Sequence, residues 1–311
     1  MEILALIAGL AGLWLGTEST IRGAVSIAER FGVSEFIVGV AILSIGSDLP
    51  ELAIAVDAAI KILGGVDASD LIVGSALGSS LGQIGFVLGA AGLVAFLTLP
   101  RRVVMQHGAV LLGSIVFLGL FGFDGTVTRT EGLSLVMLYA IYLWLLLTDT
   151  RNPVDEDADG HASLVASAFY LVVGLAIVVG SAELTVESAK RLAIAFSIEQ
   201  SFIAIIIIGL GSSLPELSIS MGALLKGRTH LSVGNLIGSN VFDTLVPVGI
   251  AAVITDLRFD AGMLNFEVPF LFFLTLIVLV FFATTKGIKK YEAAIILALY
   301  LGYAAYKFAT A

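Results

Sequence analysis

The 311-residue sequence contains no cysteine and little charge. Without cysteine, disulfide bonds and thiolate metal sites are excluded. Histidine is also scarce, and His107, His161 and His230 lie near predicted helix ends, too scattered to form a ligand cluster. Charged residues make up 13% of the chain, which is about half of the ~25% found in soluble domains. This composition excludes an ordinary soluble domain.

Apolar residues take the place of the missing charge. They account for 58% of the chain, and the mean hydropathy is +1.05. A transmembrane helix needs about 20 apolar residues, and the apolar runs accommodate about ten such helices. We therefore predict an all-α membrane protein whose ten transmembrane helices cover residues 3–27, 35–63, 69–93, 103–122, 131–148, 163–189, 200–225, 231–254, 266–284 and 290–308.

The net charge is −9, and much of it lies in the predicted linker, at residues 155–159. An acidic chain is a poor partner for nucleic acid, so we expect none to bind. Lys and Arg in the loops indicate orientation, because they favour the cytoplasmic side. Six lie on the side of the two termini and nine on the other. The count predicts a multi-pass cell-membrane protein with both termini extracellular.

Two motifs occur twice in the chain. G-S-D-L-P-E at residues 46–51 returns as G-S-S-L-P-E at 211–216, and G-S-S-L-G-Q at 78–83 returns as G-S-N-V-F-D at 238–243. Each half holds five predicted helices, an odd number, so the second half enters the membrane from the opposite side. We predict a first five-helix repeat, a hydrophilic linker and a second, inverted repeat, at residues 1–148, 149–162 and 163–311.

The first motif is costly inside a bilayer. Pro50 and Pro215 lack a backbone donor and clash with the preceding helical turn. Glu51 and Glu216 place carboxylates where a charge costs on the order of 3 kcal/mol. Irregular backbone at this depth is tolerated only where it lines a protein-enclosed cavity. We therefore expect helices 2, 3, 7 and 8 to be broken around one central ion site.

The two motif pairs offer only oxygen ligands. They supply carboxylates, hydroxyls and one side-chain amide, and the helix breaks are expected to free backbone carbonyls near Ser44 and Gly209. Hard cations such as Ca²⁺ take six to eight oxygens, whereas transition metals favour imidazole or thiolate. The candidate ligands are Glu51, Glu216, Asp243, Asp48, Ser47, Ser212, Ser213, Ser79, Ser239, Gln83, Ser44 and Gly209.

Charge balance favours exchange of cations at this site. Four unpaired carboxylates, from Glu51, Glu216, Asp243 and Asp48, cannot all stay ionised in a low-dielectric cavity. One Ca²⁺ leaves two charges, which Na⁺ or H⁺ would balance. Competition between Ca²⁺ and several monovalent ions for one set of carboxylates is the physical basis of antiport.

The two G-S-x-L-P-E motifs and the two G-S-x-x-x-[Q/D] motifs resemble the α-repeats of the sodium/calcium exchanger family, in the Ca²⁺/cation antiporter superfamily. The resemblance covers nearly the whole chain. It implies antiport of Ca²⁺ against Na⁺, with helices 1 and 6 sliding as a long pair across a fixed core. It further implies that Glu51 and Glu216 are the central Ca²⁺ ligands and that Asp243 is the third acidic residue. The serines implied to supply oxygens for Na⁺ are Ser47, Ser212, Ser79 and Ser239.

The sequence departs from this family pattern at two positions. Asp48 stands where the family usually has a small hydroxyl residue, as Ser213 is in the second half. Gln83 stands where an asparagine is common. These departures keep a Ca²⁺/H⁺ or K⁺-dependent antiporter open as the alternative function.

Other interpretations of the motifs were weighed against antiport. Glu51 and Glu216 could simply stabilise helix N-termini, but that does not explain their duplication. A passive cation channel usually needs several subunits around a pore, whereas two halves of one chain suffice to enclose a site. An intramembrane hydrolase would have to use Asp48 and Asp243 as an aspartyl dyad. We expect a carrier that is not an enzyme, has no cofactor, works as a monomer in the lipid bilayer, and has Ca²⁺ and Na⁺ as its cargo.

Glycine also marks expected packing sites. Gly16 and Gly180 are expected to let helices 1 and 6 cross closely. The glycines at i, i+4 spacing in helices 3 and 8 are expected to allow close helix packing, namely Gly74, Gly78, Gly234 and Gly238.

Overall fold

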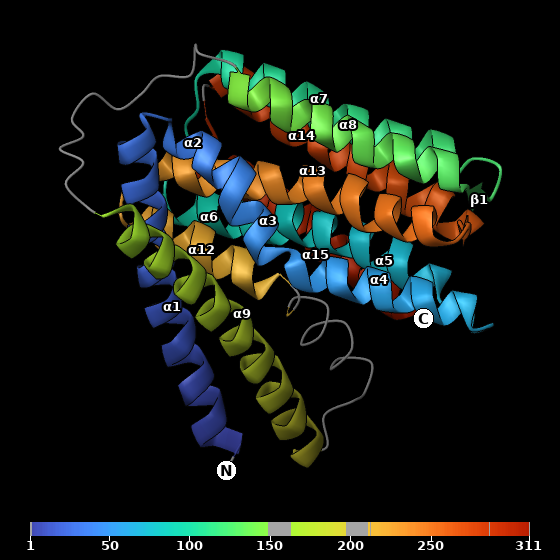
Figure 1. The fold of residues 1–311 in the computed structure, drawn as a ribbon, viewed down its shortest axis with the longest axis horizontal. Helices are drawn as coiled ribbons and strands as arrows, with labels where there is room; N and C mark the ends of the chain where they lie inside the picture. Colours follow the sequence, from blue (N-terminus) through green and yellow to red (C-terminus); the bar gives the residue numbers. More distant parts are fainter. Residues whose placement is uncertain (1, 149–162, 197–210, 212, 286, 311) are drawn as a thin grey trace.

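The computed structural model describes residues 2–148, 163–196, 211, 213–285 and 287–310. As predicted, these residues fold almost wholly into helices (Figure 1). The helices of the first half are α1 (Glu2–Phe31), α2 (Glu35–Val38), the π-helix η1 (Gly39–Leu43), α3 (Ser44–Ser47), α4 (Leu49–Leu63), α5 (Ser69–Leu81), the π-helix η2 (Gly82–Val87), α6 (Leu88–Val94), α7 (Arg101–Phe121) and α8 (Arg129–Thr148). Those of the second half are α9 (Leu164–Ala195), α12 (Leu214–Leu225), α13 (Thr229–Ile254), the π-helix η4 (Met263–Glu267), α14 (Val268–Thr285) and α15 (Lys290–Thr310).

Eight helices in the described chain are long and apolar enough to cross a membrane. The bent pair Glu35–Ser47 and Leu49–Leu63 makes a ninth span. The remaining predicted span, 200–225, is described only at residue 211 and from 213 onward, so the count of ten stays a prediction. Large apolar side chains such as Trp14 and Trp144 are exposed on the outside of the molecule, as expected for a surface that faces lipid.

The prediction that helices 3 and 8 are broken is wrong, because both are continuous in the structure. Helix 3 runs without interruption from Ser69 to Val94, with the π-helix η2 between α5 and α6. Helix 8, which is α13, is continuous from Thr229 to Ile254. Neither G-S-x-x-x-[Q/D] motif contains a proline, so every residue in it keeps a backbone donor. In helix 3 a π-helical turn takes up the local irregularity instead.

Helices α1 and α9 form a long pair that projects from the rest of the molecule (Figure 1). With 30 and 32 residues, they are ~45 and ~48 Å long at 1.5 Å per residue, well beyond the ~30 Å hydrocarbon core. Their backbones meet through glycine. A Cβ atom on Gly16 would lie 2.8 Å from the Val178 nitrogen, and one on Gly174 would lie 2.5 Å from the Thr20 nitrogen.

This packing confirms Gly16 as a crossing point and replaces its expected partner. Gly180 is exposed, and a Cβ atom there would meet no atom of the described residues. Gly174, six residues earlier, takes that place. The helix face of Gly180 could not be assigned from sequence, because α9 is apolar all round and its hydrophobic pattern does not mark a buried face.

The ion-site helices of the two halves pack backbone to backbone. A Cβ atom on Gly234 would lie 2.6 Å from the Phe36 carbonyl oxygen, and one on Gly238 would lie 2.7 Å from the Val40 carbonyl oxygen. The expectation that these glycines allow close packing is confirmed at Gly234 and Gly238. It is wrong at Gly78, where a Cβ atom would meet no atom of the described residues, and a Cβ atom on Gly74 would meet only the Met263 side chain, at 3.2 Å. An ion pair between Arg228 and Glu35, 2.6 Å long, also joins the starts of α13 and α2. Helix α13 therefore lies in the middle of the molecule, against the broken helix of the first half (Figure 1).

Two pairs of loops join the halves. The strands β1 (Thr126–Val127) and β2 (Leu257–Arg258) pair antiparallel, with Thr126 opposite Arg258. They link the connection between helices 4 and 5 to that between helices 8 and 9. A single bridge joins Leu97 to Ile288 and so links the connection after helix 3 to that after helix 9. Exchanging the two five-helix halves converts one loop pair into the other.

Candidate ion-binding site

The broken helix of the first half turns at Asp48. Helix α3 ends at Ser47 and α4 begins at Leu49, with a bend of 45° between the two parts. Pro50 occupies the second position of α4, where its missing N–H costs nothing. Glu51 follows in the first turn, where the helix dipole favours a negative charge.

The second half repeats this local geometry. Helix α12 begins at Leu214 with Pro215 second and Glu216 in its first turn. The residue before the helix is Ser213, with φ −92° and ψ 10°, and its counterpart Asp48 has φ −91° and ψ 3°. The two hexapeptides therefore place their carboxylates in the same way, each on its own half.

Four carboxylates converge in the core of the protein. Asp48, Glu216 and Asp243 are completely buried, and Glu51 is 7% exposed. The Asp48 and Glu216 carboxylates lie within hydrogen-bonding range of each other. Glu51 is in electrostatic range of both Glu216 and Asp243. The buried side chains of the described residues include neither lysine nor arginine, so no such residue offsets these charges there.

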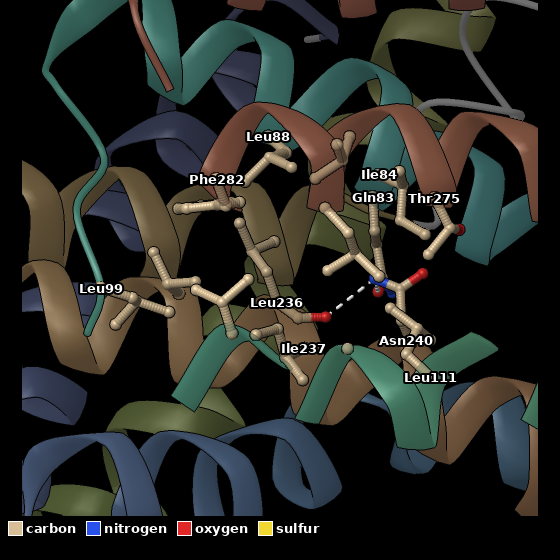
Figure 2. Close-up of a pocket in the computed structure, with 15 residues that line it drawn as sticks. Gln83, Ile84, Leu88, Leu99, Leu111, Leu236, Ile237, Asn240, Thr275 and Phe282 are labelled. Atoms are coloured by element: carbon tan, nitrogen blue, oxygen red, sulfur yellow. Dashed lines mark hydrogen bonds between the residues drawn. The ribbon is translucent and has the colours of Figure 1, made fainter. Parts of the chain in front are cut away.

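An amide network fixes one of the four carboxylates. The Gln83 side-chain nitrogen donates to Asp243 Oδ2 at 3.0 Å and to Ser79 Oγ at 3.1 Å. The Asn240 side-chain nitrogen donates to Gln83 Oε1 at 2.9 Å and to the Leu236 carbonyl at 2.8 Å (Figure 2). A glutamine of the first half thus holds an aspartate of the second.

Many oxygens of the site lack a donor. Buried polar atoms in proteins nearly always have a hydrogen-bond partner. Here the buried oxygens without one include both carboxylate oxygens of Asp48 and of Glu216, Glu51 Oε2, Asp243 Oδ1, Ser213 Oγ and Ser239 Oγ. Within the described chain, no three carboxylate or imidazole side chains come close enough to hold one metal ion among them. A set of buried oxygen acceptors without protein donors suits hard cations, which supply the missing positive charge.

A small, largely apolar cavity lies beside the amides of the candidate site. It has a volume of about 30 Å³ and lies between α7, α13 and α14, next to Gln83 and Asn240 (Figure 2). Leucine, isoleucine, valine and phenylalanine make up most of its wall. A water needs two to four polar partners, and this wall offers few.

The sequence and the fold of this chain are similar to those of known membrane proteins. The profile described as sodium/calcium exchanger protein matches residues 1–148 and 166–309. The chain belongs to the sodium/calcium exchanger family. An uncharacterised membrane protein of Methanocaldococcus jannaschii is 30% identical over 94% of this chain and 93% of its own length. The putative antiporter CaxA of Alkalimonas amylolytica is 30% identical over 95% of each chain. A structure of the sodium-calcium exchanger NCX_Mj, soaked with Na⁺ and Ca²⁺, has a TM-score of 0.83 at 28% identity, covering 98% of this chain and 97% of its own.

The exchanger motifs bring most of the predicted ligands together. The structure places these predicted residues in one buried region: Glu51, Glu216, Asp243, Asp48, Ser47, Ser213, Ser79, Ser239, Gln83 and Ser44. Ser47 also contacts Glu216 across the two halves. Gly209 and Ser212 lie outside the described residues. Whether the residues of this region bind ions stays a prediction.

The predicted role of the Ser44 carbonyl is corrected. This oxygen accepts the Asp48 backbone N–H at 3.0 Å and Ser47 Oγ at 3.2 Å. It is therefore not freed by the break. The donor that Pro50 lacks would bond four residues back, at Gly46 rather than at Ser44. The Ser44 hydroxyl group is buried and donates to the Val40 carbonyl at 2.5 Å.

Sequence reasoning missed one residue of this region. Tyr139 on α8 is buried, and its hydroxyl group has no hydrogen-bond partner. Its ring packs edge-on against Phe242, with 5.5 Å between ring centroids. The hydroxyl group lies beside Ser44 and in electrostatic range of Asp48. Nothing in the largely apolar sequence of α8 distinguishes this tyrosine from one that faces lipid.

Proposed function

We propose that this member of the exchanger family exchanges Ca²⁺ for Na⁺ across the cell membrane by alternating access. The observation that carries the proposal is the burial of four carboxylates with no lysine or arginine among the described residues to neutralise them. Such a site is costly when empty, because unpaired buried charges are strongly destabilising. Crossing without cargo is thereby penalised, which is the requirement for coupled exchange.

Glu51 and Glu216 are assigned as the shared Ca²⁺ ligands. Each lies at the start of a helix after a proline, in opposite halves of the chain, and the two are in electrostatic range. Ser47, Ser79, Ser212 and Ser239 are assigned oxygens for Na⁺, with Ser213, Gln83 and Asp243 around them. The cargo fits the relatives, since NCX_Mj was solved after soaking with Na⁺ and Ca²⁺.

The proposal includes ten transmembrane helices in two inverted repeats, divided by the linker at 149–162. The two loop pairs support it, because Thr126–Arg258 and Leu97–Ile288 exchange when the halves are exchanged. We place both termini outside the cell, on the loop-charge argument, and treat a single chain as the working unit.

Alternating access is assigned to the α1–α9 pair moving against the remaining helices. Contacts of α1 with α12 use side chains, namely a Thr17–Ser218 hydrogen bond of 2.7 Å and a Lys226–Glu18 ion pair. The glycine contacts of α13 with α2 and η1 leave no such freedom, because there backbone meets backbone. Side-chain contacts are more easily exchanged during a sliding motion, so we assign the α2–α13 unit as the fixed part.

A Ca²⁺/H⁺ antiporter is the second candidate, favoured by the fourth carboxylate at Asp48. A flux measurement separates the two. Liposomes containing the purified protein are loaded with Ca²⁺, and Na⁺, K⁺ or a pH step is then applied outside. We expect Ca²⁺ to leave when Na⁺ is added and not in Na⁺-free medium at constant pH. Efflux that follows the pH step and ignores Na⁺ would assign the second candidate, and no coupled efflux at all would refute the proposed function.

A further inference from the structure

Helices α1 and α9 hold equivalent positions in the two halves of the chain. The two hexapeptides lie 165 residues apart in the sequence, and the same offset relates Gly9 of α1 to Gly174 of α9. The structure repeats their contacts. A Cβ atom on Gly174 would lie 2.5 Å from the Thr20 nitrogen, and a Cβ atom on Gly9 would lie 3.1 Å from the Thr185 nitrogen. Residues of α1 and α12 can therefore be matched one by one with residues of α9 and α4.

Helix α12 is covered by α1 along its length. The Thr17 and Ser218 hydroxyl groups form a hydrogen bond of 2.7 Å, and a Cβ atom on Gly222 would overlap the Thr17 side chain. At the end of α12, Lys226 forms an ion pair of 2.5 Å with Glu18. The protein is therefore closed on the side of the turn that joins α12 to α13.

The equivalent contact between α9 and α4 is open. By the same offset, Glu18 corresponds to Glu183 on α9, and Lys226 corresponds to Lys61 on α4. Helix α4 and the C-terminal part of α9 diverge (Figure 1). Glu183 is exposed and forms no ion pair with any described residue, while Lys61 pairs with Asp57 on its own helix. The chain thus carries the same acid–base pair twice, and the structure forms it once.

The repetition is specific to the ion pair. Thr17 corresponds to Ala182, and Ser218 corresponds to Ala53, so the hydrogen bond between α1 and α12 has no counterpart between α9 and α4. The glutamate and the lysine keep their charges in both halves. Exposed ion pairs contribute little to stability, so a lysine can exchange one carboxylate partner for another during a motion.

We propose that Glu18–Lys226 and Glu183–Lys61 are two alternative latches, each of which holds one side of the carrier closed. The proposal rests on the proposed function, because it requires the α1–α9 pair to move against α4 and α12. Since α1 and α9 meet backbone to backbone, Glu18 and Glu183 move together. A shift that takes Glu18 away from Lys226 brings Glu183 to Lys61, which then leaves its partner on α4. Each latch favours the state in which it is formed.

Distances between two spin labels test the latches. The natural chain has no cysteine, so labels can be attached at Val66→Cys, after α4, and at Ile194→Cys, near the end of α9. Both natural side chains are exposed. Pulsed electron spin resonance on the protein in lipid nanodiscs, in one Na⁺ medium, gives the ratio of a short distance, with α9 closed on α4, to the long distance of Figure 1. We expect Glu18→Gln to raise this ratio and Glu183→Gln to lower it, each about two- to fivefold, as for one exposed ion pair.

Further variants separate a latch from a general effect on packing. Glu187→Gln is the matched control, because it removes a carboxylate of α9 that pairs with Arg191 on the same helix, and it should leave the ratio unchanged. Lys61→Glu should lower the ratio by placing two like charges at the second latch. Lys61→Glu combined with Glu183→Lys should restore the ratio of the natural chain, because the pair is rebuilt with its charges exchanged.

Two results would overturn the latches. The first is a shift of the ratio in the same direction in Glu18→Gln and Glu183→Gln. The second is an unchanged ratio in both of these variants. Either result, together with intact Na⁺-driven Ca²⁺ efflux, would remove the latches and leave the proposed function standing. Absence of that efflux in the natural chain would remove the proposed function itself.

Discussion

Glu216 and Glu51 have the surroundings that a transported cation requires. Both oxygens of Glu216 are buried without a donor, and Glu51 Oε2 shares this state. Each carboxylate follows a helix break and lies near a helix N-terminus. The helix dipole stabilises such a charge by only about 0.3–1 kcal/mol. That is too little to offset burial of a carboxylate, so a bound cation or a proton must supply the rest.

Neutralising either glutamate should abolish Ca²⁺ transport. Glu51→Gln and Glu216→Gln keep the side-chain volume and remove one charge from the proposed Ca²⁺ site. Loss of one partner from a buried charge pair costs about 2–5 kcal/mol, so Ca²⁺ affinity should fall at least ~30-fold. The measurement is equilibrium ⁴⁵Ca²⁺ binding to the purified variants, with Asp57→Asn on α4 as the control. Unchanged binding in either glutamine variant would show that its carboxylate is not a ligand.

For individual residues, the sequence predicted which side chains gather at the candidate site better than it predicted their contacts. The repeated hexapeptide identified Glu51 and Glu216, because a proline and a carboxylate inside an apolar run are costly without a function. It did not predict that the Ser44 carbonyl stays bonded to Asp48, because hydrogen bonding at a bend depends on the local backbone angles. Nor could it find Tyr139, whose role depends on which face of α8 meets α13.

Helix α13 and the broken helix of the first half behave as one packed element. Their backbones touch at Gly234 and Gly238, so the two cannot separate or rotate without losing close contacts. The α1–α9 pair is internally tight in the same way, but it meets α12 through side chains. The described residues thus form a tightly packed α1–α9 pair and a tightly packed α2–α13 unit, and the four buried carboxylates lie outside the α1–α9 pair.

Enlarging Gly174 should impair transport by forcing α1 and α9 apart. A Cβ atom there would lie 2.5 Å from the Thr20 nitrogen and 2.9 Å from the Gly16 carbonyl oxygen, both backbone atoms that cannot move aside. Overpacking of this kind costs about 1–3 kcal/mol. We expect Gly174→Val to lower thermal stability in detergent and to slow Na⁺-driven Ca²⁺ efflux.

Gly180→Val is the matched control on the same helix. Gly180 is exposed, and a Cβ atom there meets no described residue. This variant should keep both the stability and the flux of the natural chain. Equal behaviour of the two valine variants would contradict the assigned α1–α9 contact.

Helix spans were predictable from length and apolar composition, but helix packing was not. Most described spans begin and end within a few residues of the predicted bounds. The exceptions are informative: α9 runs six residues past its predicted end at 189, to Ala195. The added residues follow the apolar run and include Arg191, which contacts Glu187 at 2.9 Å. Hydropathy predicts only the apolar part of a helix, so it cannot predict where a helix continues beyond that part.

The molecule as a whole is organised by the relation between its halves. An aspartate of the second half is held by a glutamine of the first, and Asp48 of the first faces Glu216 of the second. Loop pairs join the halves again through Thr126–Arg258 and Leu97–Ile288. The duplicated motifs predicted one central site shared by both halves, because the same costly helix break with a carboxylate occurs in each.

The most direct measurement is the position of a bound divalent cation. Crystals of the natural chain soaked with Sr²⁺, a Ca²⁺ analogue with a usable X-ray absorption edge, would give an anomalous difference peak at the ion. The account predicts a peak between the Glu51 and Glu216 carboxylates that disappears when Sr²⁺ is replaced by excess Na⁺. A peak elsewhere, or one that contacts only a single half of the chain, would contradict it.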